Sequence, residues 1–220
     1  RAKSGSFSYA ANFYYMGYKD QLILTGQIND VGAYIRENVA SSFRAGIELE
    51  GAYAISKTWT LGGNLALSQN KIREFTEYID DYSVDEFRQE TITYTNTDIA
   101  FSPNVVSSAI IEYKPAKNLS INWLSKYVGR QFLDNTANEA RSLDAFFTND
   151  LRISYAATPR FFKGLEVNLL INNIFNELYE PNGYTFSYFV PGGFGRELVT
   201  ENFYYPQAGT NFLLGVKMKF

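Results

Sequence analysis

Long stretches of alternating apolar and polar residues constrain the fold of this chain more than any other feature. In residues 43–53 the two faces of an extended strand separate clearly. The odd positions hold Phe43, Ala45, Ile47, Leu49, Gly51 and Tyr53, and the even positions hold Arg44, Gly46, Glu48, Glu50 and Ala52. Because successive side chains of a strand point to opposite faces, one face suits lipid and the other suits water. Soluble strands typically run about 5–6 residues, whereas a tilted transmembrane strand needs roughly 9–11.

The same pattern recurs along the chain and predicts about nine strands. They are residues 7–15, 21–28, 43–53, 59–68, 98–113, 119–128, 147–155, 165–171 and 212–220. Residues 21–28 are ambiguous because three apolar residues follow one another there, and Ser125 and Asn149 interrupt otherwise apolar faces. The predicted fold is all-β, a transmembrane antiparallel β-barrel.

Composition excludes several other classes of protein. No run of eighteen or more apolar residues is present in the sequence, so a transmembrane helix is not predicted. A membrane protein without such helices must be a closed barrel, because only closure pairs every backbone group in lipid. The chain has no Cys and no His, and its net charge of −3 comes from mixed charges. We therefore expect no enzyme, no resident metal or cofactor, and no nucleic-acid partner.

The connections between the predicted strands alternate in length. Short ones fall at 17–20, 55–58, 114–118 and 156–163, and long ones at 29–40, 72–97, 131–143 and 177–206. Short turns on one side and long loops on the other are typical of outer-membrane barrels. An odd strand count cannot close in the usual way, so we expect further strands before Arg1 and place Phe220 at the periplasmic rim. Pro103 is expected to mark a bulge or the point where its strand leaves the sheet.

Three groups of side chains are candidates for function. Charges predicted to face the lumen are Arg44, Glu48, Glu50, Arg130 and Arg152. They fit a ligand path or a surface for a plug, but charges that pair across strands in a solvated lumen are the simpler interpretation. In the last long loop, Tyr184, Tyr188 and Arg196 are candidate ligand-binding residues, or residues with which the loop packs on itself. Asp80–Asp81 and Asp85–Glu86 fit a solvated loop better than a calcium site.

Five segments, spread over most of the chain, carry a resemblance to one family. INNIFNELYEPNGYTF (171–186) is similar to its penultimate strand and following loop through Asn172, Asn173, Phe175, Asn176 and Tyr179. KYVGRQFLDN (126–135) resembles its Tyr-x-Gly-Arg-Gln-Tyr-x-Asp-Asn segment, and FYYPQAGTNFLLGVKMKF (203–220) its last strand. The other two segments are YKDQLILTGQIND (18–30) and SFRAGIELEGAYAI (42–55). The family is that of the TonB-dependent outer-membrane receptors.

This resemblance implies a 22-stranded barrel, of which residues 1–220 would be the C-terminal portion. A plug domain and a TonB box, neither found in this chain, would precede it. The implied function is uptake of a scarce nutrient, in the first place a ferric siderophore or similar metal chelate, across the Gram-negative outer membrane. The implied partners are the TonB complex, outer-membrane lipids, a small-molecule chelate and the barrel-assembly machinery, which would read Phe220; a surface lipoprotein is a further candidate. A passive porin-like barrel and a soluble all-β binding module are the alternatives.

Overall fold

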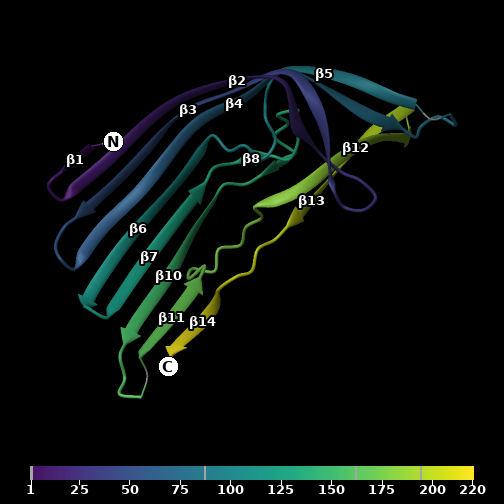
Figure 1. Cartoon of the computed structure of the whole chain (residues 1–220). Helices are drawn as coiled ribbons and strands as arrows, with labels where there is room; N and C mark the ends of the chain where they lie inside the picture. The colour runs from purple at the N-terminus through teal and green to yellow at the C-terminus, as the bar shows by residue number, and fades with distance from the viewer. Residues whose placement is uncertain (1, 87, 162, 194) are drawn as a thin grey trace.

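Antiparallel strands form one curved, open sheet (Figure 1) in the computed structural model, which describes residues 2–86, 88–161, 163–193 and 195–220. No helix in these residues is long and apolar enough to cross a membrane. The strands follow the chain across the sheet: β1 (Ala2–Ser4), β2 (Phe7–Ile28), β3 (Tyr34–Ala54), β4 (Trp59–Asp81), β6 (Val105–Ala116), β7 (Leu119–Val128), β10 (Phe146–Ala157), β11 (Gly164–Asn172) and β14 (Asn211–Lys219).

We call the sheet formed by these nine strands the wall. The remaining strands belong to the long connections and lie at one end of the wall (Figure 1). They are β5 (Arg88–Asp98), β8 (Gln131–Phe132), β9 (Ser142–Leu143), β12 (Asn182–Gly192) and β13 (Gly195–Tyr205). β5 pairs with the distal half of β4, β8 pairs with β9, and β12 pairs with both β13 and β4. The wall and the loop strands therefore share β4.

The register of the sheet separates an apolar face from a polar one. One row of directly paired residues crosses the wall through Phe212, Ile171, Leu151, Trp123, Ile111, Leu61, Tyr53 and Phe7. A row on the other face runs through Arg152, Asn122, Glu112 and Thr60. Because directly opposed residues share a face of the sheet, the alternation along each strand becomes one continuous apolar surface suited to lipid.

Aromatic rings cluster on the apolar face beside the short turns. Trp59 stacks on its partner Tyr113 with ring centroids 4.3 Å apart, and Phe7 meets Tyr53 edge-on at 6.4 Å. Amphipathic rings favour the headgroup zone of a bilayer. This end of the wall therefore carries an aromatic belt of the kind that flanks the apolar band of outer-membrane barrels.

The two polar interruptions of the apolar face satisfy each other. Ser125 and Asn149 are directly paired across β7 and β10, and the Ser125 hydroxyl donates to Asn149 Oδ1 at 2.7 Å. Trp123 Nε1 also donates to Asn149 Oδ1, at 3.1 Å. Such pairing removes most of the cost of placing polar groups on a face turned to hydrocarbon. Both registers therefore agree with the predicted ones.

Several predicted boundaries are wrong. Residues 17–20 form no turn, because β2 runs unbroken from Phe7 to Ile28 and Asp20 adopts a φ of 52° within it. Turn-type residues there suggested a break, but pairing with β3 continues on both sides. Residues 98–113 are not one strand: β5 ends at Asp98, Pro103 lies between strands, and β6 begins at Val105. The long connections around 72–97 and 177–206 are largely paired strands. An antiparallel hairpin can have one face packed and the other in water, so it can project from the wall.

Gly46 is a position where a side chain does not fit. A Cβ there would lie 2.5 Å from the Leu67 carbonyl oxygen and 2.7 Å from the Tyr14 hydroxyl. We predict that Gly46→Ala lowers the free energy of unfolding of the full-length barrel by about 1–3 kcal/mol through overpacking. Urea unfolding, followed by heat-modifiable migration in gels, measures this.

The matched control is Gly51→Ala in the same strand. There the nearest atom to a new Cβ is 3.9 Å away, so little change is expected. Equal stability of the two variants would contradict the prediction.

Candidate functional site

Residues 129–143 fold into the interior at the long-loop end of the wall. β8 and β9 bring the two ends of this segment together, and the Leu133 amide donates to the Arg141 carbonyl at 2.8 Å. Leu133 and Asn135 are both 0% exposed. Asp134 caps the turn between them and Arg141 by accepting from the amide and hydroxyl of Thr136. The segment is therefore packed and internally hydrogen-bonded, and we call it the floor.

Two contacts fix this floor to the wall. The Asn135 side chain donates to the Leu24 carbonyl at 2.6 Å and accepts from the Ala100 amide at 2.8 Å. Gly26 has a φ of +95° and passes so near the floor that a Cβ would lie 2.6 Å from the Leu133 oxygen. Only glycine adopts this conformation at no steric cost.

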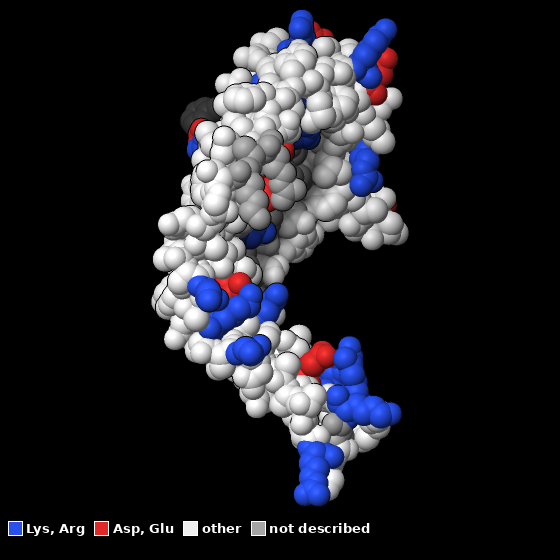
Figure 2. Space-filling model, turned by 60° about the vertical axis from the view of Figure 1, so that its left-hand side comes forward, with Lys and Arg blue, Asp and Glu red and all other residues white. Residues whose placement is uncertain are grey.

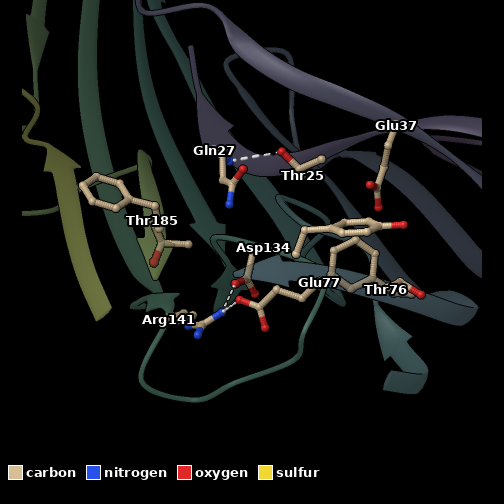
Figure 3. A pocket seen from close by; sticks show the side chains of 11 residues that line it. Thr25, Gln27, Glu37, Thr76, Glu77, Asp134, Arg141 and Thr185 are labelled. Atoms are coloured by element: carbon tan, nitrogen blue, oxygen red, sulfur yellow. Dashed lines mark hydrogen bonds and ion pairs between the residues drawn. The ribbon is translucent and has the colours of Figure 1, made fainter. Parts of the chain in front are cut away.

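A buried guanidinium joins three separate parts of the chain. Arg141 is 3% exposed, and its Nη1 donates to Glu77 of β4 and to Asp134 of the floor, the latter at 2.7 Å. Nη2 donates to the Ser187 hydroxyl of β12 at 2.7 Å. Figure 3 shows Arg141, Glu77 and Asp134 converging below Gln27 and Thr25. Since a buried charge needs partners, this cluster holds floor, wall and hairpin in one arrangement.

The same cluster shifts the pKa of two groups. Burial acts to lower the pKa of Arg141, but Asp134 and Glu77 outweigh it and the pKa is raised. Burial, and the hydrogen bond that the Tyr94 hydroxyl donates to Glu77 at 2.8 Å, raise the pKa of Tyr94 to about 12. Both groups therefore keep their protons at any physiological pH.

The β12–β13 hairpin docks on β4 through backbone and charge. Tyr188 and Phe189 pair in parallel with Asp80 and Asp81. Arg196 Nη1 donates to Asp81 Oδ2 and to Glu90 Oε1, each at 2.9 Å. The guanidinium also lies over the Phe189 ring, 4.2 Å from its centroid. We call this set of contacts the Arg196 latch.

These contacts leave two neighbouring cavities. The smaller, of about 50 Å³, is shown in Figure 3 and is lined by Thr25, Gln27, Glu37, Phe75, Thr76, Glu77, Tyr78, Asp134, Arg141, Thr185 and Phe186. The larger, of about 640 Å³, shares Gln27, Tyr78 and Phe186 with it. The molecule is visibly hollowed in Figure 2. The larger cavity falls within the roughly 300–1,000 Å³ of small-molecule sites.

Comparison with known proteins identifies the family. The model of the TonB-dependent receptor-like β-barrel matches residues 2–174. The chain belongs to this family. Members of the TonB-dependent receptor family are outer-membrane proteins of Gram-negative bacteria that act as transporters and not as enzymes, so the soluble alternative does not apply. No curated protein matches the chain in a sequence comparison.

Solved receptor structures share the fold. The ferric yersiniabactin uptake receptor FyuA from Yersinia pestis is 12% identical with a TM-score of 0.63, and the match covers 99% of this chain and 28% of the receptor. The siderophore receptor PiuA from Acinetobacter baumannii is 15% identical with a TM-score of 0.60, covering 96% and 26%. The copper transporter OprC is 16% identical with a TM-score of 0.63, covering 99% and 29%. This TonB-dependent receptor chain thus spans less than a third of the length of these proteins.

The structure places the predicted site residues in different surroundings. Arg44, Glu48, Glu50 and Arg152 share the polar face of the wall, and Arg44 donates to Asn70 at 3.0 Å. Arg130 lies beyond the end of β7 and pairs with Glu139. Whether these charges face a solute path stays a prediction.

Of the predicted ligand-binding residues, the two tyrosines contact rings or the larger cavity, and the arginine is ion-paired. Tyr184 stacks on Phe203 at 4.8 Å, and Tyr188 lines the larger cavity. Arg196 is held by two carboxylates, so its observed role is to join two hairpins. Phe220 follows β14 at the short-turn end, where Lys219 pairs with Gly164. Among the described residues, no group of three or more Asp or Glu side chains is placed to hold a metal ion.

Sequence reasoning missed the residues that organise the site. Arg141, Glu77 and Tyr94 lie on three different segments and carry no local motif. Asp134 and Asn135 end the segment KYVGRQFLDN, and this resemblance was the one signal that pointed to the floor. Their partners could be found only from the fold.

We predict that Arg141→Met in the full-length receptor destabilises the loop assembly by about 3–5 kcal/mol, because Glu77 and Asp134 lose their buried counter-charge. Hydrogen exchange of residues 129–143 measures this as faster local opening. The variant Arg141→Met combined with Glu77→Gln and Asp134→Asn should recover much of the protection. Wild-type exchange in the single variant would refute the role assigned to Arg141.

The Arg196 latch should open in acid. The hydrogen bond from Arg196 lowers the pKa of Glu90, and those from Ser83 followed by Arg196 lower the pKa of Asp81. A carboxyl whose pKa is lowered on folding contributes stability above its ordinary pKa and loses it as pH falls through the folded value. We therefore predict that the hairpins separate below about pH 4.

Spin labels attached to Glu86→Cys, between β4 and β5, and to Glu197→Cys, in β13, measure the distance between the two hairpins in the full-length receptor. Separation of the hairpins broadens the distribution of this distance. Arg196→Ala should broaden it at neutral pH, and Arg160→Ala, at a short turn, should not. An unchanged distribution in acid would be inconsistent with the latch.

Proposed function

We propose that this chain is the C-terminal wall of a receptor for TonB-dependent uptake of a scarce nutrient, with a ferric siderophore or similar metal chelate as its solute. The cavity of about 640 Å³ at the long-loop end carries this proposal. Rings of Tyr78, Phe186 and Tyr188 line it, and aromatic walls with a few polar groups are typical of small-molecule sites. The relatives named above are described as receptors for siderophores and a transporter for copper.

The proposed function also involves further domains and partners. A plug and a TonB box elsewhere in the protein would couple uptake to the TonB complex. Phe220, at the short-turn end, would present the aromatic terminus to the barrel-assembly machinery. The apolar face would contact outer-membrane lipids, and a surface lipoprotein would bind at the long-loop end.

Uptake of radiolabelled ferric chelates by cells that express the full-length receptor tests this function. We predict accumulation in cells with TonB and only background levels in cells without it, because transport against a gradient needs the energised partner. The purified receptor in planar bilayers should conduct little, since a plug fills the barrel. Uptake independent of TonB, or large ungated conductance, would favour the passive porin-like alternative.

A further inference from the structure

The larger cavity is acidic as well as aromatic. Its lining includes the rings of Tyr78, Tyr82, Phe186 and Tyr188 and the carboxylates of Asp30, Asp80 and Glu201. The other lining residues are Gln27, Ile28, Ile35, Gln89 and Ser187, so no Lys or Arg takes part. We call this cavity the acidic aromatic groove.

Its carboxylates accept hydrogen bonds only from neutral donors among the described residues. Gln89 Nε2 donates to Asp80 Oδ1 at 2.8 Å, and the Tyr188 hydroxyl donates to Glu201 Oε1 at 2.9 Å. The ion pairs of the described chain include neither of them, nor Asp30. The negative charge of the groove is therefore not compensated within these residues.

Arg141 and Arg196 are already paired with other carboxylates. Arg141 faces Glu77 and Asp134, and Arg196 faces Asp81 and Glu90. The Arg141 cluster has one more carboxylate than it has cations and adds negative charge beside the groove. The Arg196 cluster is balanced, because Arg88 also pairs with Glu90. The pKa of Tyr82 is raised by the charge of Asp80, and that of Tyr188 by its hydrogen bond to Glu201. A negative field of this kind repels an anionic solute.

The small cavity adjoins the groove and, unlike the groove, has an arginine in its lining. Arg141 lines it, and Arg141 Nε is buried without a hydrogen-bond partner among the described residues. Buried donors of this kind usually have an acceptor. An oxygen from water or from a bound solute would satisfy it, in a space of about 50 Å³.

We propose that the acidic aromatic groove binds the positively charged end of a small solute, an ammonium or guanidinium group held against the rings and between the carboxylates. Cations are attracted to the faces of Tyr and Phe rings, and more strongly where water is excluded. The inference rests on the proposed uptake function and narrows its solute to one that carries a cationic group. An anionic chelate without such a group would meet the like charge of three carboxylates in this groove.

Two fluorescent probes of like size and aromatic area, naphthyltrimethylammonium and naphthalenesulfonate, test the inference. Their binding to the full-length receptor in nanodiscs of zwitterionic lipid is followed by fluorescence anisotropy. We expect the cation to bind at least about tenfold more tightly than the anion. Asp80→Asn combined with Glu201→Gln should reduce this preference about fivefold or more. Asp144→Asn, an exposed change of charge outside the groove, should leave it unaltered.

Heat-modifiable migration shows that each variant has folded. Equal or tighter binding of the anion, no binding of either probe, or an unchanged preference in the folded double variant would overturn the inference. The uptake function is refuted by a different measurement, namely transport that does not require TonB. A receptor that selects the cation but transports without TonB would keep the groove and lose the function.

Discussion

A backbone amide turned toward hydrocarbon has no water to bond, and the ladder from β2 to β14 gives these groups their partners. Every other property of the wall follows from this ladder. Its register aligns Trp123 with Ile111 and Leu151, so that the alternation of each strand becomes a single apolar face. It also brings Ser125 opposite Asn149, where two polar side chains satisfy each other on that face.

Beyond the wall the same chain must stabilise hairpins without help from lipid. Burial supplies part of the answer, as in Ile72, Ile79 and Leu133. Charge supplies the rest, because Arg141 ties floor, wall and hairpin together at one buried point. A buried ion cluster contributes little net stability compared with apolar packing, but it penalises every arrangement that separates its members. Specific placement of the hairpins is thus what the cluster provides, and the shape of the acidic aromatic groove depends on it.

The wall was predictable from sequence because its information is local. Period-two alternation in 43–53 or 212–220 sets the faces of a strand without reference to any other residue. The loop assembly was not, since Glu77 and Arg141 are far apart in the sequence and their pairing depends on how β4 continues past the wall. The turn predicted at 17–20 failed for a related reason. Gly17 and Asp20 are turn-type residues, but Gly17 pairs with Phe43 and the pairing with β3 resumes at Gln21, directly after Asp20.

β4 belongs at once to the wall, through β3 and β6, and to the loop assembly, through β5 and β12. The buried positions are even up to Ile72 and odd from Phe75 onward, because Arg73 and Glu74 are both exposed where the two halves meet. The direction of the far half therefore depends on the number of residues at this junction. Insertion or deletion of a single residue near Ile72 would turn Phe75, Glu77 and Ile79 to the opposite face, whereas a change of two residues would preserve their direction. Length variation among descendants of this sequence should therefore occur in pairs within β4 and freely at the tip between Asp81 and Arg88.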